Sequence, residues 1–140
     1  MGPSLASRFS PHVQDLVRVL SLRIILFRAT PFPVNYPAST LGAPPMAVAW
    51  QSYFEEAKSA AHSYLKRISA DLESSSLAVE TRHLPGDPAA NIIDLASRTP
   101  DSFIAMTSRG QGGLARAVLG SVADRVVRHA AEPVLVIRPK

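Results

Sequence analysis

Apolar and polar positions alternate along this chain in a way that predicts four helices and four strands. Apolar residues recur at helical spacing over 5–20 and again, for longer, over 46–72. Two shorter helices are expected to start near Asp87 and Ser121. Continuous apolar runs predict three buried strands, at 23–28, 103–106 and 134–137. A weaker alternation that charged residues interrupt predicts an edge strand at 77–84.

The regular order of these elements indicates the fold class. Helices and strands alternate from one end of the chain to the other, which is typical of parallel strands joined by right-handed crossovers. We therefore predict an α/β protein with a doubly wound, mostly parallel sheet and helices on both faces. Its 140 residues are expected to form one domain over 1–140. The Pro-rich segment 29–45 is expected to be a long loop, because its five prolines suit neither a helix nor a central strand.

Three local features of the predicted helices bear on their ends and faces. Pro11 either kinks the first helix or begins a shorter one that Ser10 caps. Asp87 is expected as the N-cap of the third helix, with Pro88 as its first residue. The aromatic residues of the long helix, at helical spacing, are expected in the core: Trp50, Phe54 and Tyr64.

The segment after the strand at 103–106 is the best candidate for chemistry. It is rich in glycine between 110 and 113 and leads to Ser121 and Asp124, which resemble a capping box. Main-chain amides at such a helix start bind anions, and Arg109 could add a charge. The plainer interpretation, that these glycines only close a connection, stays open. A match to the dinucleotide fingerprint there is fortuitous, because too little sheet follows it.

The composition of the chain excludes several classes of site and function. Apolar residues make up 46% and charged residues 19%, there is no cysteine, and the net charge is +4 without a polybasic run. Disulfides and thiolate sites are thereby excluded, and nucleic-acid binding is not expected. No stretch is apolar for the roughly 20 residues that a membrane span needs. The four histidines lack metal-ligand spacing and no nucleophile motif occurs, so we assign neither metal ligands nor catalytic residues.

The C-terminal third also resembles the universal stress protein family. The resemblance rests on 106–128 and 133–139, in which Gly110, nine residues and Gly120-Ser121 fit that family's G-x-x-G, nine residues, G-[ST] pattern. Residues 86–89, Gly-Asp-Pro-Ala ahead of a helix, are similar too. The likeness extends over almost the whole chain from about residue 4.

The resemblance implies an adenine-nucleotide site. Some members of the family bind ATP or a related nucleotide, which would come with Mg²⁺ in the case of ATP. Thr107 stands where the nucleotide binders have glycine. Carried over by position, Ala29 would line the adenine pocket. The phosphates and ribose would meet the other matching residues, which are Thr107, Arg109, Gly110, Gly120, Ser121 and Val122.

The family pattern also includes a central first strand that ends in an acidic contact to the nucleotide. Only residues 1–4 precede the first predicted helix here, too few for a strand of five or six residues. Three explanations are open: the chain starts too late, a neighbouring chain donates a strand, or the remaining strands close together. We favour the first.

Three functions follow from these observations. The leading hypothesis is a cytoplasmic stress-response protein that binds ATP or a related nucleotide without turning it over. The alternative is an interaction module without nucleotide that dimerises through its last strand, as the resemblance implies; that strand consists of Val134, Leu135, Val136 and Ile137. Slow ATP hydrolysis comes third, because no metal ligands or water-orienting group are evident.

Overall fold

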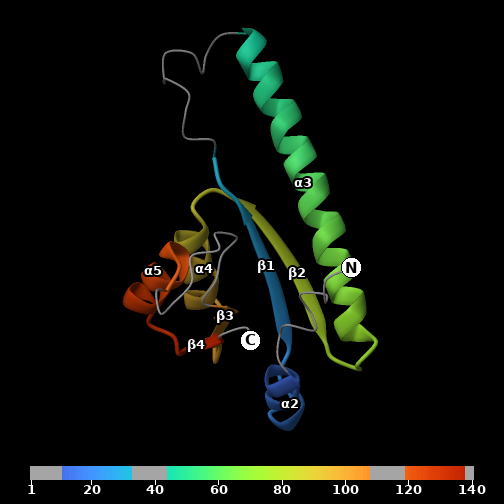
Figure 1. The fold of residues 1–140 in the computed structure, drawn as a ribbon, viewed down its shortest axis with the longest axis vertical. Helices are drawn as coiled ribbons and strands as arrows, with labels where there is room; N and C mark the ends of the chain where they lie inside the picture. Colours follow the sequence, from blue (N-terminus) through green and yellow to red (C-terminus); the bar gives the residue numbers. More distant parts are fainter. Residues whose placement is uncertain (1–10, 33–43, 108–118, 138–140) are drawn as a thin grey trace.

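The fold is the α/β arrangement that the pattern predicts. A computed structural model describes residues 11–32, 44–107 and 119–137 of the chain. Its helices and strands alternate along the sequence (Figure 1). Their bounds are α2 Pro11–Val19, β1 Ile24–Thr30, α3 Pro44–Glu73, β2 Val79–Pro85, α4 Pro88–Ser97, β3 Ile104–Thr107, α5 Ser121–His129 and β4 Val134–Ile137.

Several boundaries differ from the predicted ones by a few residues. Strand β1 continues to Thr30 and α3 begins at Pro44, so both ends of the expected loop 29–45 belong to regular elements. Proline fits at Pro44 because the first helical residues donate no intrahelical hydrogen bond. The start of the first predicted helix, including Ser10, lies outside the described residues.

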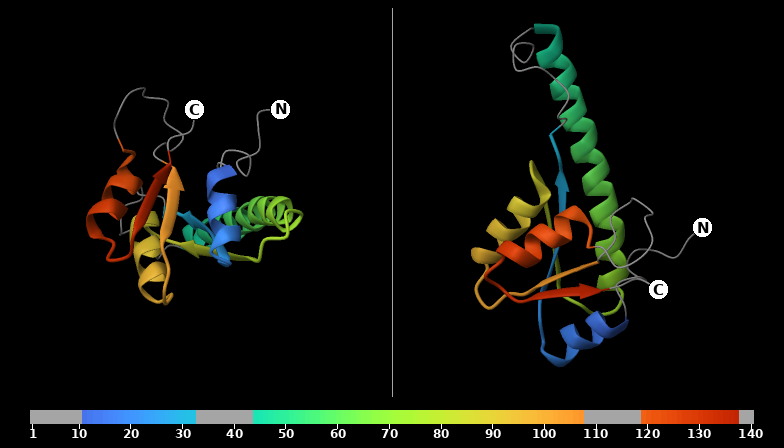
Figure 2. Two further views of the ribbon diagram at one scale, coloured as in Figure 1. Left: turned by 90° about the horizontal axis from the view of Figure 1, so that it is seen from below. Right: turned by 60° about the vertical axis from the view of Figure 1, so that its left-hand side comes forward.

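The strands pair in parallel, in two separate pairs. Strand β1 pairs with β2 in a register that places Ile24 beside Val79, and β3 pairs with β4 with Ile104 beside Val134. Within the described residues no ladder joins β1 to β3. The remaining strands have therefore not closed together, which rules out one of the three explanations considered for the short N-terminal segment. The two pairs are steeply inclined to one another (Figure 2).

Two hydrophobic clusters hold the pairs in place. The first joins α2 and α3 to the β1–β2 pair through Val13, Val17, Ile68 and Leu72. The second joins α4 and α5 to β3, and Val126 at its centre is fully buried. Helices thus lie on both sides of the strands, with α4 and α5 on one side of β3 and β4 and α2 on the other (Figure 2).

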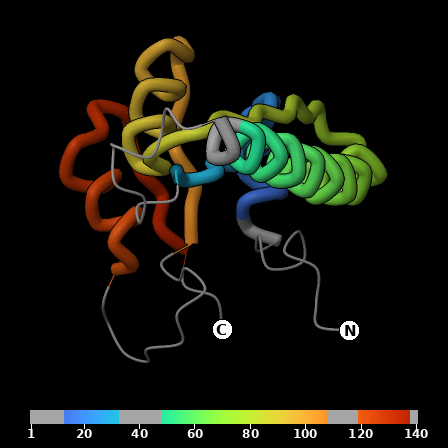
Figure 3. Tube along the Cα trace, turned by 90° about the horizontal axis from the view of Figure 1, so that it is seen from above, coloured from blue at the N-terminus to red at the C-terminus, as the bar shows by residue number. Residues whose placement is uncertain are grey.

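The N-terminal half of α3 extends beyond the strands (Figure 1) and carries an aromatic group. Seen from above, α3 leads away from the side of the molecule that holds α4 and α5 (Figure 3). Trp50 stacks on Phe54 with 5.9 Å between ring centroids, and Tyr53 and Phe32 meet Phe54 edge-on at 5.6 Å each. These rings pack on each other and not in either cluster, so the expectation that Trp50 and Phe54 belong to the core is wrong. Tyr64, farther along, does pack against the first cluster.

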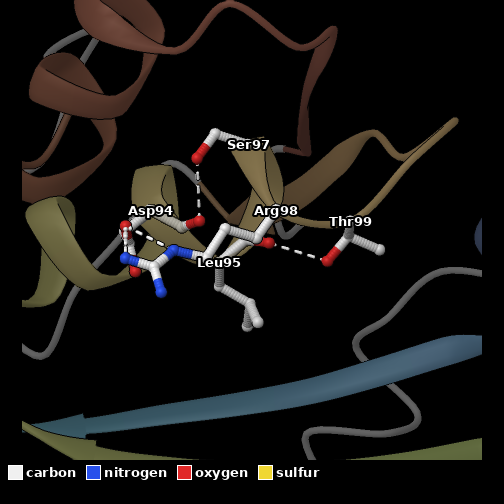
Figure 4. Close-up of polar contacts among 5 residues, drawn as sticks. All are labelled: Asp94, Leu95, Ser97, Arg98 and Thr99. Carbon is white, nitrogen blue, oxygen red and sulfur yellow. Dashed lines mark hydrogen bonds and ion pairs between the residues drawn. The ribbon is translucent and has the colours of Figure 1, made fainter.

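Side chains and backbone together secure both ends of α4. At its start, the Asp87 carboxylate accepts a hydrogen bond from the Ala90 amide at 2.7 Å, as the sequence predicts. At its end, the Thr99 hydroxyl donates to the Leu95 carbonyl at 2.7 Å, and Arg98 binds the Asp94 carboxylate (Figure 4). The Leu95 side chain points from this fixed turn toward β1 (Figure 4).

Candidate functional site

Among the residues that the structure describes, no side chain caps the N-terminus of α5. Gly120 is the N-cap, with φ −58° and ψ 156°, and it has no side chain that could accept a hydrogen bond. The expected capping box of Ser121 and Asp124 is therefore wrong: Ser121 is already the first helical residue. The Asp124 carboxylate instead accepts from the Arg128 side chain at 2.9 Å, one turn later. First-turn amides point out of a helix along its axis, so this end of α5 is suited to an anion.

Helix α4 shows the opposite arrangement at its start. Besides capping Ala90, Asp87 pairs with the Arg125 guanidinium of α5 at 2.8 Å. The hydrogen bond from the Ala90 backbone is the main cause that lowers the pKa of the Asp87 carboxyl, and Arg125 adds to it. The protein's own carboxylate thus occupies the anion position of α4, whereas no carboxylate of the described residues caps α5.

A large cavity opens beside the start of α5. Its volume is about 840 Å³, and its walls come from α2, β1, α3, α4, β3 and α5. Thr107, at the end of β3, lines it together with three residues of the α5 start, namely Gly120, Ser121 and Val122. These four of the predicted site residues meet at one cavity although Thr107 and Gly120 are 13 positions apart in the sequence.

The other predicted site residues are not brought together in this way. Ala29 is the penultimate residue of β1, half-buried beside Leu84 of β2, and it is absent from the cavity wall. Arg109 and Gly110 lie outside the described residues.

A second polar cluster, on β1, β2 and α3, was not predicted. The Thr30 hydroxyl and the His83 Nε2 atom are 2.8 Å apart, and His62 approaches His83 with 6.0 Å between ring centroids. Nearby, the Arg28 guanidinium lies 4.5 Å from the centre of the Tyr64 ring. Burial lowers the pKa of His83, and the positive charges of His62, Arg28 and Lys58 lower it further. Sequence spacing could not reveal this cluster, because it forms across three elements.

The fold and the start of α5 define an α/β protein with a cavity between its two strand pairs, which residues 24–27 of β1 and 104–107 of β3 line. The family model of the universal stress protein family matches residues 12–138. The chain therefore belongs to the universal stress protein family.

Known relatives agree with this assignment. Universal stress protein MJ0531 of Methanocaldococcus jannaschii is 34% identical over 94 residues, which are 67% of this chain and 55% of that protein. The match thus spans about half the length of this curated relative.

Solved structures share the fold. The structure of hypothetical protein MJ0577, studied for a structure-based assignment of biochemical function, has a TM-score of 0.76 at 22% identity, over 92% of this chain and 84% of that one. The universal stress protein from Archaeoglobus fulgidus in complex with dAMP has a TM-score of 0.61 at 19% identity, over 94% and 86%. The relative in that complex holds an adenine nucleotide.

The described residues were also considered for a metal site and a membrane span, and they offer neither. Across 11–32, 44–107 and 119–137, no cluster of three or more His, Asp or Glu side chains is arranged to hold a metal ion. None of the helices in these ranges is long and apolar enough to cross a membrane.

Proposed function

We propose that this protein is a cytoplasmic stress-response protein that binds ATP or a related adenine nucleotide at the start of α5. The phosphates accept hydrogen bonds from the first-turn amides of α5, beginning at Ser121, and benefit from the positive end of the helix. Gly120 lets the phosphate approach the backbone, because it has no side chain. The family resemblance assigns the Arg109 side chain and the Gly110 backbone to the phosphates as well, and it assigns Ala29, which lies outside the cavity wall, to the adenine.

One observation carries this proposal: within the described part of the chain, α5 begins without a side-chain cap at the wall of a cavity of about 840 Å³. That volume is within the range of about 300–1,000 Å³ usual for small-molecule sites. Membership of the universal stress protein family and the dAMP complex of a relative support the same ligand class. In this proposal phosphates and water hold the Mg²⁺ ion that accompanies ATP, since Mg²⁺ keeps much of its hydration in such sites.

Two substitutions of Ser121 test the proposed contact. Ser121→Pro removes one amide donor at the first helical position, where proline is well tolerated. Ser121→Ala keeps that amide and removes only the hydroxyl. We expect isothermal titration calorimetry with ATP and AMP to show binding that Ser121→Pro weakens about 10-fold or more. The binding loss with Ser121→Ala should be smaller. Absence of heat at millimolar nucleotide, or equal effects of both substitutions, contradicts the proposal.

A second candidate function is an interaction module that dimerises through β4. The Ile104 amide donates to the Pro133 carbonyl at 2.9 Å, so the alternation of a parallel ladder turns the peptide groups of Val134 and Val136 away from β3. Leu135 is 39% exposed. An edge with these properties can pair with a second copy of the strand.

A further inference from the structure

The face of the β1–β2 pair that meets α3 changes character along the strands. Ile24 and Leu26 of β1 pack against the first hydrophobic cluster. Because side chains alternate along a strand, Arg28 and Thr30 lie on the same face as these two residues. The register places Arg28 beside His83 of β2. This face is therefore apolar where the strands begin and polar toward their carboxyl ends, the edge at which parallel α/β sheets bind ligands.

Basic side chains from three elements gather at this polar end, around His83. The Thr30 hydroxyl lies 2.8 Å from the His83 Nε2 atom, and the His62 ring of α3 approaches with 6.0 Å between ring centroids. Lys58 precedes His62 by one turn of α3, and its charge acts on His83. Arg28 adjoins His83 in the ladder and acts on it as well. We call Arg28, Lys58, His62 and His83 the cationic cluster.

Within the described residues, no ion pair joins the cationic cluster to a carboxylate. These residues contain all 11 Asp and Glu side chains of the chain. On β2 itself, Glu80 alternates to the other face and pairs with Arg82. Each charged group that shifts the pKa of His83 is a cation that lowers it further. Because like charges repel at this range, a bound anion would stabilise the arrangement.

We propose that the cationic cluster binds a tetrahedral oxyanion, a phosphate or sulfate dianion, either free or as the phosphoryl group of a small molecule. Arg28 and Lys58 supply fixed positive charge. Protonated His83 donates from Nε2 to the Thr30 hydroxyl, so its Nδ1–H and the hydroxyl hydrogen can both be donated to the anion. The two fixed positive charges disfavour a metal ion at the histidines. None of these residues lines the cavity beside α5, so the proposal does not depend on nucleotide binding.

Sulfate tests the site in the unchanged protein, because it stays a dianion over the whole range in which histidine titrates. A bound anion favours the protonated imidazole and so raises the pKa of His83. We expect the protonated form to bind sulfate about 10-fold more tightly than the neutral form, and NMR titration of the His83 ring measures the resulting rise of its pKa. Sodium chloride at equal ionic strength is the control for screening and should raise that pKa much less.

Two lysines of α3 provide matched variants. Lys58→Gln removes one charge of the cationic cluster. Lys66→Gln, about two turns farther along the helix, removes the same charge from a side chain that is not among the cations acting on His83. With the His62 and His83 rings as readout, sulfate binding should weaken about 10-fold in Lys58→Gln and less than about 2-fold in Lys66→Gln. Arg28→Gln should act like Lys58→Gln.

The proposal is wrong if sulfate leaves the His83 ring unchanged, if chloride acts as strongly as sulfate, or if the two lysine variants bind sulfate alike. It is also wrong if zinc chloride, and not sulfate, shifts both histidine rings, because the pair is then a metal site. Inorganic phosphate and glycerol phosphate, titrated against the same rings, distinguish the two sources of the anion: tighter binding of the ester assigns the site to a phosphorylated molecule, and tighter binding of phosphate to the free ion. Nucleotide binding at α5 is read at the α5 amides instead, so failure of one proposal is distinct from failure of the other.

Discussion

The Asp87 carboxylate lies 2.8 Å from the Arg125 guanidinium and so links the start of α4 to the first turns of α5 across 38 positions of sequence. Its other oxygen accepts from the Ala90 amide. One side chain therefore serves as a helix cap and as a contact between two helices of the second cluster. At the start of α5, by contrast, none of the described side chains serves as a cap.

Substitutions of Asp87 should separate its two contacts. Asp87→Asn keeps an oxygen that caps the helix and loses the charge, whereas Asp87→Ala loses both. We expect the free energy of unfolding to fall more for Asp87→Ala than for Asp87→Asn. Arg125→Ala, which removes only the exposed ion pair, should resemble Asp87→Asn. Urea denaturation of the three variants checks the order, and an equal effect of both Asp87 variants would show that the cap contributes nothing.

Gly120→Asp should strengthen the fold and weaken nucleotide binding at once. The backbone at Gly120 is in a conformation open to any residue, and aspartate is among the best N-caps. Its carboxylate would accept from the α5 amides and so take the position that we propose for a phosphate. We expect a gain of about 0.3–1 kcal/mol in the free energy of unfolding. Calorimetry should show no nucleotide binding; retained affinity would place the phosphates elsewhere.

Two adjacent valines of α5 provide a matched test of the second cluster. Val126 is fully buried and Val127 is 43% exposed. Val126→Ala should cost about 2 kcal/mol, since it removes buried methyl groups and leaves a small cavity. Val127→Ala should change stability by less than about 0.5 kcal/mol. Chemical denaturation measures both, and similar losses at the two positions would contradict the burial described for α5.

Stability should depend on pH through His83. Because its pKa is lowered in the folded protein from the ordinary 6.5, the unfolded state binds more protons between those two pKa values. Stability therefore rises with pH through this interval and falls as pH drops below about 6.5. His83→Asn should flatten the dependence there, and His129→Asn, on the exposed end of α5, serves as control. Thermal unfolding from pH 5 to 8 measures this pH dependence of stability. If the slope is unchanged in His83→Asn, His83 is not its source.

Dimerisation through β4 predicts a species of twice the 15.0 kDa chain mass in light scattering. Val136→Pro removes an amide that points away from β3, so it should yield monomers while the β3–β4 pair persists. Leu135→Lys tests the exposed side chain at the same edge. A monomer at micromolar concentration before any substitution would remove the dimer hypothesis.

Local signals in the sequence predicted most elements of the fold. The run Val134–Ile137 is β4 without a shift, and Asp87 with Pro88 marks the start of α4 at the observed residues. Such features depend on a few neighbouring residues, through apolar periodicity or a capping side chain. The capping box predicted at Ser121 failed because Gly120 is the N-cap and Ser121 is already the first helical residue.

The candidate site was predictable only in part, because local sequence patterns do not show which distant residues meet. The glycine pattern indicated the α5 start, but only the folded chain decided that Thr107 and Gly120 share a cavity wall and that Ala29 does not. The contact between His62 and His83 likewise needed α3 to pack on β2.

Taken alone, the sequence determined the order and type of the elements, the family and one capped helix, because each is written in short-range patterns. The tertiary structure decided that the strands form two pairs, that an apolar cavity lies between them, and that Asp87 rather than a ligand fills the α4 start. These depend on contacts between residues far apart in the chain, where packing and hydrogen-bond geometry determine the outcome.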